Sequence, residues 1–248
     1  MKEKIISEQQ LKRKTFFAFA FFVFASIVVV LLWMWLRKEP KEQGVQPTLR
    51  TGLLLNEKLF ASTFNNDKLV KTYPVSEAVK RVRVNGSLGL RSQLDSASWR
   101  LQIIKKTGDT LTLTMEDIKK LPKTDVVFDF KCIEGWSQKT WWGGVTVTDF
   151  IKHYKLEEDT KFNFASLATP DKQYYVGLDM PSFQHPQTLL CYEMNGKPLP
   201  LNQGYPLRLI VPVKYGIKHI KRIGTIYFSN QRPADYWAER GYDYYSGH

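Results

Sequence analysis

The thiol of Cys132 is the side chain whose surroundings most strongly suggest chemistry. It lies in the run FDFKCIEGWS at 128–137. The residues before it are mostly β-branched or aromatic and predict a strand over 125–131. The glycine and tryptophan after it predict a loop. A thiol at the end of a strand can contact a ligand or a metal, whereas a thiol in the middle of a core cannot.

Residue chemistry alone leaves several roles open for this thiol. The chain has one other cysteine, Cys191, so a disulfide between the two is one alternative. A buried apolar thiol is another, because free cysteines are usually buried. A nucleophilic cysteine or a zinc site would need nearby histidines, and the sequence holds only four, widely scattered. The last alternative is a thiolate that supplies one ligand to a metal held mainly by an organic cofactor.

A second pattern, in the C-terminal half, predicts an anion-binding group. Arg208 stands in the apolar run GYPLRLIVP at 204–212, and the basic run VKYGIKHIKR follows at 213–222. A semi-buried arginine needs a partner, and a carboxylate or a phosphate matches its planar donors. Lysines and backbone N–H groups in a tight turn also bind anions. The alternative is a solvated basic loop, which the apolar residues around Arg208 disfavour.

Short strands with few helices are predicted between these motifs. Thr114 is expected to cap a short helix, and Thr148 is expected to cap a second one. The region that follows Cys132 is expected to be a loop. The fold class is therefore α+β, mostly strand, with helices segregated from the sheets. Strands are expected over 81–84, 99–104, 110–113, 125–131, 161–168, 173–178, 188–194, 207–213 and 220–228, and a helix followed by a loop over 56–73.

The first part of the chain is unlike the rest. Residues 15–36 contain no charged side chain and end in Trp33-Met34-Trp35-Leu36, which is typical of a membrane interface. At about 1.5 Å per residue, this segment is long enough for a bilayer core of about 30 Å. A cleaved signal peptide is the alternative, although its apolar core would be shorter. We expect a basic cytoplasmic tail over 1–14, a transmembrane anchor over 15–36, a linker over 37–50 and one domain over 51–248.

The net charge by itself excludes few classes of binding partner. The net charge is +12, and the isoelectric point is near 9.5. The lysines are scattered and no nucleic-acid-binding module is recognisable, so we expect no nucleic-acid partner. A basic surface that faces anionic lipid or an acidic partner is the simpler interpretation.

Five motifs in order carry a resemblance to a known family. They are CIEGWS, NGKPLP, GYPLRLIVPVKYGIKHIK, RPADYW and GYDYY. Together they resemble the sulfite-oxidase-fold molybdopterin oxidoreductases, and most closely the branch of the periplasmic methionine sulfoxide reductase catalytic subunits (MsrP). The resemblance runs from about Asn56 to the C-terminus. It implies a sulfite-oxidase-type domain that binds molybdenum through a single molybdopterin (Mo-MPT).

The resemblance also implies roles for particular residues. Cys132 would ligate molybdenum, and Arg208 with the turn His219-Ile220-Lys221 would hold the pterin phosphate. Because His219 replaces a small residue, its backbone N–H is the expected donor. The other cofactor-binding positions implied are Asn56, Ser166 and Gln203.

The reaction is expected from the loop around the thiol. Sulfite oxidases carry an arginine soon after the cysteine, whereas this loop carries Glu134 and no arginine. A carboxylate there would repel sulfite, so a neutral S-oxide that loses its oxygen is the expected substrate. Glu134 could move protons, and Tyr242 or Tyr244 could supply a hydroxyl on the substrate side. Trp136, Trp141 and Trp142 could equally line a pocket or fill the core.

Partners and location follow from the same resemblance. The sequence has no heme-attachment motif, so electrons are expected from a membrane cytochrome b or a quinone-linked partner. The domain is expected on the periplasmic side of a bacterial inner membrane. A sulfite oxidase-type enzyme and a non-catalytic membrane-anchored binding domain remain alternatives.

Overall fold

A computed structural model describes residues 7–41, 45–65 and 68–248 of the chain. These form two compact units, Met1–Gly52 and Leu53–His248. The first six residues of the predicted basic tail and residues 42–44 of the predicted linker lie outside the described residues, as do residues 66–67 in the predicted helix-and-loop segment.

The first unit contains one long helix, α1 (Glu8–Lys38). Ser7 caps its N-terminus in a reciprocal pair with Gln10, which satisfies backbone N–H groups that the first turn leaves free. The helix has 31 residues, and an 18-residue stretch of it has a mean hydropathy of 2.8. None of its side chains is buried in the structure. By length and composition, this helix is a candidate membrane span.

The helix α2 (Pro47–Thr63) follows. It begins nine residues before the helix that the sequence predicts at Asn56, and it occupies the end of the predicted linker. Within the second unit, its Glu57 forms an ion pair with Arg232 at 2.5 Å.

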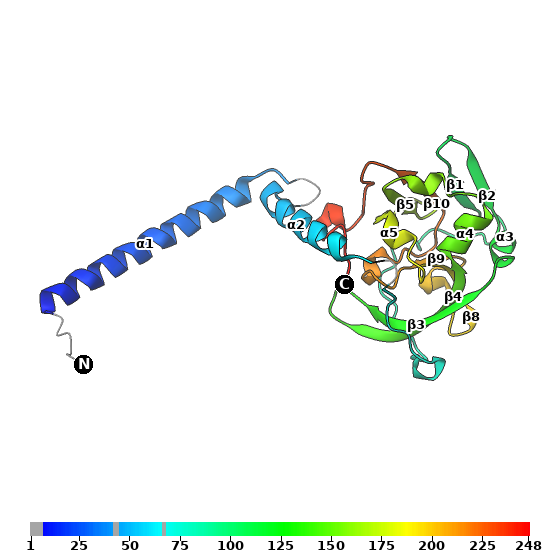
Figure 1. Cartoon of the computed structure of the whole chain (residues 1–248), viewed down its shortest axis with the longest axis horizontal. Coiled ribbons are helices and arrows are strands. Elements are labelled where there is room, and N and C mark those ends of the chain that lie inside the picture. Colours follow the sequence, from blue (N-terminus) through cyan, green and yellow to red (C-terminus); the bar gives the residue numbers. More distant parts are fainter. Residues whose placement is uncertain (1–6, 42–44, 66–67) are drawn as a thin grey trace. The chain divides into compact units, whose positions relative to one another are not determined.

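The second unit is built on two sheets of five strands each within the described residues (Figure 1). The first sheet has the order β2-β1-β10-β5-β6. In the second sheet, β3, β4, β7 and β8 follow one another, and β9 also pairs with β7. The strand bounds are β1 Leu101–Ile104, β2 Thr110–Leu113, β3 Thr124–Lys131, β4 Ser137–Thr146, β5 Phe164–Ala168, β6 Tyr175–Asp179, β7 Leu189–Met194, β8 Lys197–Pro198, β9 Arg208–Ile210 and β10 Thr225–Ser229.

The strand β4 corrects the sequence analysis, which expected a loop there. It has ten residues and pairs with β3 from Thr124↔Gly144 to Lys131↔Ser137. Two glycines concealed it, because glycine is unfavourable in strands. They are needed where β7 approaches, since a Cβ on Gly144 would lie 2.2 Å from the carbonyl oxygen of Leu190. The register with β7 shifts at the same point, as in a β-bulge.

Three short helices lie beside the sheets: α3 (Met115–Lys119), α4 (Val147–His153) and α5 (Met180–Phe183). Thr114 caps α3 as predicted. The cap of α4 is Thr146 rather than Thr148, because the strand β4 runs directly into this helix. Residues 81–84 form no strand, and several strands are shorter than expected at one or both ends.

The core divides into two clusters of buried side chains. The larger includes Leu101, Leu167 and Leu209 and extends over both sheets. The smaller includes Phe128, Trp142 and Cys191 and lies against the second sheet, beside the β3–β4 turn. The mixed α+β architecture therefore agrees with the predicted fold class. Burial of these apolar surfaces fixes the second sheet, and this sheet positions the site.

Candidate active site

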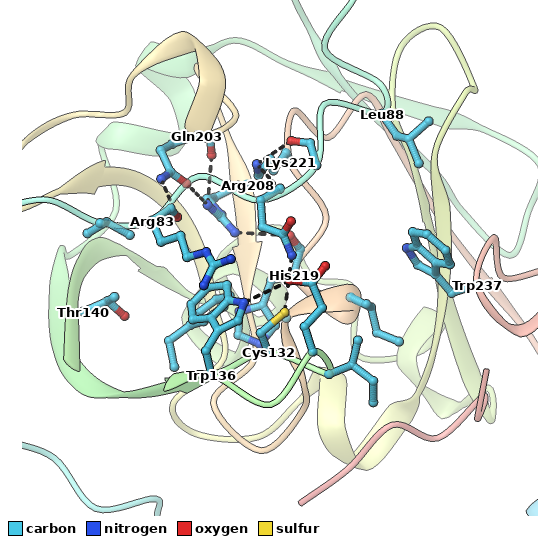
Figure 2. A pocket seen from close by; sticks show the side chains of 18 of the residues that line it. Arg83, Leu88, Cys132, Trp136, Thr140, Gln203, Arg208, His219, Lys221 and Trp237 are labelled. Atoms are coloured by element: carbon cyan, nitrogen blue, oxygen red, sulfur yellow. Dashed lines mark hydrogen bonds between the residues drawn. The ribbon is translucent and has the colours of Figure 1, made fainter. Parts of the chain in front are cut away.

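A cavity of about 340 Å³ opens beside the turn between β3 and β4 (Figure 2). Its size is within the range of small-molecule and cofactor pockets. Segments that are far apart in the sequence contribute to its wall. The residues with polar, aromatic or thiol side chains that line it are Arg83, Asn85, Phe130, Cys132, Glu134, Trp136, Thr140, Trp142, Tyr174, Gln203, Arg208, His219, Lys221, Trp237 and Tyr242.

Cys132 is the first residue after β3 and lies in this wall. Its N–H donates to the carbonyl of Trp136 at 2.9 Å, and its own carbonyl accepts from the N–H of Gly135 at 3.0 Å. Gly135 has a φ of +86°, a conformation that glycine adopts without strain. The tight turn holds the thiol at a fixed point. Asn85 Nδ2 donates to its sulfur at 3.3 Å.

Arg208 opens β9 and is 2% exposed. Its Nη1 donates to the carbonyl and the Oε1 of Gln203 at 3.0 and 2.9 Å, and its Nη2 donates to the carbonyl of His219 at 3.4 Å. Its guanidinium lies 4.6 Å from the ring centre of Trp142. Its Nε has no partner among the described residues. Burial lowers the pKa of Arg208 to about 10, because desolvation disfavours the charged form of the guanidinium.

Lys221 is the second cation of the cavity. Its Nζ donates to the carbonyls of Asn85, Gly86 and Asn202 at 2.7, 3.0 and 3.1 Å. Burial and the charge of Arg208 lower the pKa of Lys221 to about 7. Two cations that repel each other in one cavity are unfavourable until an anion lies between them.

His219 lies beside these cations and is uncharged at neutral pH. Burial and the charge of Arg208 lower its pKa to about 3. Its Nε2 contacts the carbonyl of Lys214 at 3.1 Å, which makes this nitrogen the protonated one. Its Nδ1 has no partner among the described residues.

The donor set fits a phosphate-bearing ligand next to the thiol. Neither Arg208 nor Lys221 forms an ion pair with a carboxylate among residues 7–41, 45–65 and 68–248. In the same residues, no group of three or more His, Cys, Asp or Glu side chains could hold a metal ion. A metal at Cys132 would therefore need most of its ligands from outside the chain. A metal–organic cofactor with an anionic group would meet both needs.

Comparison with known families agrees with this chemistry. Residues 88–237 match the family described as the oxidoreductase molybdopterin binding domain. The chain belongs to this molybdopterin-binding oxidoreductase family. It is therefore an oxidoreductase, and its cofactor is molybdenum bound to molybdopterin.

Relatives in the family are named as methionine sulfoxide reductase components. The chain is 30% identical over 208 residues to a putative protein-methionine-sulfoxide reductase subunit, YedZ1, of Azospira oryzae. The matched region covers 83% of this chain and 78% of that protein. It is 34% identical over 165 residues to the catalytic subunit MsrP of Campylobacter jejuni, with 61% of this chain and 56% of that protein covered. The MsrP of Xanthomonas campestris is 31% identical over 157 residues, which cover 58% of this chain and about half (49%) of that protein.

Solved structures agree on the fold. The sulfane dehydrogenase SoxCD of Paracoccus pantotrophus matches with a TM-score of 0.50 and 18% identity, and the match covers 57% of this chain and 40% of that chain. The sulfite-oxidase-type fold predicted from the motifs is thus confirmed.

The oxidoreductase fold brings most of the predicted site residues to one cavity. The predicted residues that line it are Cys132, Glu134, Gln203, Arg208, His219, Lys221 and Tyr242. Four other predicted residues lie elsewhere. Asn56 is an exposed residue of α2, Ser166 is buried in β5 of the other sheet, and Ile220 belongs to the large core cluster. Tyr244 is buried against Lys218 and Arg232.

The turn that was expected to offer backbone donors is used differently. The N–H of His219 donates to the carbonyl of Gly216 at 3.1 Å, and the N–H of Ile220 donates to the carbonyl of Lys218 at 3.0 Å. A short 3₁₀ turn at Gly216–Lys218 takes these donors, so the side chains of Arg208 and Lys221, which line the cavity, are the candidate anion-binding groups.

Sequence reasoning did not predict that Arg83 and Asn85 contribute to the cavity wall. Both belong to the segment that was expected to be a strand and a turn. The loop after Cys132 contains no arginine, as expected. Arg83, from a segment distant in the sequence, nevertheless lines the same cavity. The signal that the sequence offered was the polar end of the run RVRVNG. Backbone that pairs with no other strand must form its hydrogen bonds elsewhere.

Of the three tryptophans near the thiol, Trp136 and Trp142 line the cavity, and Trp141 does not. Trp142 is almost fully buried, so it is both wall and core. Trp141 instead donates from Nε1 to Asp125 at 2.9 Å on the exposed side of the sheet.

Proposed function

We propose that this chain is a membrane-anchored molybdenum oxidoreductase that reduces an S-oxide. The observation that carries this proposal is the cavity in which the thiol of Cys132 lies beside a carboxylate, Glu134, in a family whose named relatives include methionine sulfoxide reductase catalytic subunits. In the reaction the S–O bond breaks, two electrons and two protons are consumed, and the products are a thioether and water.

The cofactor would be held by three side chains. Cys132 would supply the protein ligand to molybdenum, while Arg208 and Lys221 would hold the pterin phosphate. Gln203 would position Arg208 through the two bonds from Nη1. Bound molybdenum supplies a site that accepts an oxygen atom and exchanges two electrons.

Protons would come from groups at the open side of the cavity. Glu134 is exposed and lines the cavity, so it can exchange protons with water. Between the two candidate tyrosines, Tyr242 lines the cavity and is 39% exposed, whereas Tyr244 is buried away from it. We therefore propose Tyr242 as the hydroxyl on the substrate side.

Electrons would come from a membrane partner, such as a cytochrome b or a quinone-linked protein. The apolar helix α1 would hold the domain beside that partner. The basic residues Lys12, Arg13 and Lys14, which precede the apolar segment 15–36 within this helix, favour a cytoplasmic N-terminus and a domain on the periplasmic side of a bacterial inner membrane.

Sulfite oxidation is a second candidate, because Arg83 brings a cation into the cavity that contains Cys132. A cation there offsets the repulsion that Glu134 would exert on an anionic substrate.

The test uses the full chain, purified in detergent from a molybdenum-sufficient host. We expect molybdenum and pterin close to one per chain and reduction of a sulfoxide by a reduced viologen dye. Faster oxidation of sulfite by an artificial acceptor would favour the second candidate. Absence of both activities from fully loaded protein would refute both.

Substitutions at the two cysteines provide the matched comparison. Cys132→Ala should abolish sulfoxide reduction, and Cys191→Ala should leave it nearly intact. Both cysteines are free in the structure, and Cys191 lies in the core. Equal loss in the two variants would contradict the assigned role of Cys132.

A further inference from the structure

Arg83 occupies an unusual position at the cavity. Its guanidinium lies 4.8 Å from the ring centre of Trp136 (Figure 2). The carbonyl of Trp136 accepts from the N–H of Cys132, so the ring on which Arg83 stacks belongs to the same short turn as the thiol. The backbone of Arg83 is fixed as well: its N–H donates to Gln138 Oε1 at 2.9 Å, and its carbonyl accepts from Gln203 Nε2 at 3.3 Å.

The indole beneath Arg83 is itself held in place. Trp136 Nε1 donates to Glu134 Oε2 at 3.1 Å, and Phe130 stacks on the ring with centres 6.0 Å apart and planes at 20°. A carboxylate at the edge of the indole, an aromatic neighbour and a cation over the ring together restrict its orientation. This support gives the flexible arginine a defined location.

Arg83 differs from the other two cations of the cavity. Arg208 and Lys221 each donate to several carbonyl or amide oxygens. By contrast, the guanidinium of Arg83 has no hydrogen bond or ion pair to another side chain in the described ranges, although Glu134 lines the same cavity. The carboxylate of Glu134 is engaged by Trp136 instead. Because Arg83 is an exposed residue of the cavity wall, its planar donors are accessible to a ligand.

We infer that Arg83 is a specificity-determining residue that selects S-oxides bearing a carboxylate near the sulfur. A guanidinium stacked on an aromatic ring keeps its in-plane N–H groups available, and these match a carboxylate in a bidentate manner. This inference rests on the proposed function and narrows its substrate class. The sulfoxide oxygen would point toward the thiol side of the cavity, and the carboxylate would lie on the Arg83–Trp136 pair.

The experiment compares two substrates that differ only in charge. These are N-acetyl-methionine sulfoxide as the free acid and the same compound as its neutral amide. For the wild-type holoenzyme with a reduced viologen dye, we expect kcat/KM about tenfold higher for the acid, which corresponds to one charge-assisted contact at a partly solvated site. The difference should lie mainly in KM, because the carboxylate binds equally before and during the reaction.

Variants separate Arg83 from general charge effects. Arg83→Gln should reduce the ratio of acid to amide to about one, whereas Arg83→Lys should restore only part of it, since lysine lacks the planar donors. The matched control is Arg81→Gln, which removes the same charge from an exposed residue that does not line the cavity. An equal fall in the ratio for Arg81→Gln would overturn the inference.

Two further measurements keep the outcome decisive. Molybdenum and pterin content should be unchanged in Arg83→Gln; a loss of cofactor would assign Arg83 to the cofactor instead and overturn the inference. Calorimetric titration of the oxidised holoenzyme with the acid and the amide should give about tenfold tighter binding of the acid. Equal binding refutes the role of Arg83, whereas absent turnover with preferential binding of the acid refutes only the proposed reaction.

Discussion

The lowered pKa of Lys221 in the cavity predicts how the stability of the cofactor-free protein depends on pH. Burial and Arg208 lower the pKa of Lys221 to about 7 from its ordinary value of 10.5. Between these values the unfolded chain binds a proton on Lys221 that the folded chain lacks. The free energy of unfolding therefore rises with pH, at up to about 1.4 kcal/mol per pH unit.

The useful window is pH 7 to 8.5. His219 and His248, whose pKa values are also lowered, have made their contribution by pH 7 because unfolded histidine titrates near 6.5. Lys214, with a pKa lowered to about 8, adds a smaller rise in the upper part of the same window. Burial raises the pKa of Cys191 to about 12, so its opposing contribution begins near pH 9, where the unfolded thiol ionises.

Integration over this window gives about 1–2 kcal/mol for Lys221, once solvent screening of a partly buried ammonium is allowed for. The measurement is urea unfolding of the full chain in detergent, produced without molybdopterin and followed by tryptophan fluorescence. The free energy of unfolding should increase by this amount from pH 7 to 8.5 at constant ionic strength.

Variants and the loaded protein show whether the slope comes from the cavity. Lys221→Met should remove most of the slope and leave the smaller part that comes from Lys214, whatever the change in absolute stability from the lost bonds. Substitution of the exposed Lys197 by Met should leave the slope unchanged. Holoprotein should show no such rise, because a phosphate beside Lys221 keeps the ammonium charged. Equal slopes in wild type and Lys221→Met would refute the assignment of Lys221 as an anion-seeking group.

Three further substitutions test the scaffold and the proton path. The ammonium of Lys218 contacts Asp235 Oδ2 at 2.5 Å, so Asp235→Asn leaves this ammonium buried without a counter-charge. The substitution should lower the free energy of unfolding by about 3–5 kcal/mol in urea titrations. Gly144→Ala forces a Cβ against the backbone of β7 and should lower the melting temperature by several degrees in calorimetry, whereas an unchanged melting temperature would contradict the close approach. Tyr242→Phe should reduce kcat for sulfoxide about tenfold or more with unchanged molybdenum content, and an unchanged kcat would remove Tyr242 from the proton path.

Local patterns in the sequence predicted several elements well. The hairpin of β1 and β2, the capped helix α3, the strand before Cys132 and the apolar helix near the N-terminus all depend on contacts between close neighbours in sequence. Alternation, capping residues and continuous apolar runs report such contacts directly.

Other features depended on contacts between distant segments. The strand β4 tolerates its two glycines because β7 packs against them, and no local signal reports this neighbour. In the same way, Thr148 resembled a helix cap, while the position of Thr146 at the end of β4 made it the actual cap.

The site divides along the same line. The sequence by itself grouped Cys132, Arg208 and Lys221 into one predicted cofactor site through the resemblance of its five motifs to a known family, whereas their residue types alone left several roles open. Only the tertiary structure decided which side chains share their cavity. It brought in Asn85 and Arg83 and left Asn56, Ser166, Ile220 and Tyr244 outside. The physical reason is that a cavity wall is assembled by packing between segments, and packing depends on the whole core rather than on neighbours in sequence.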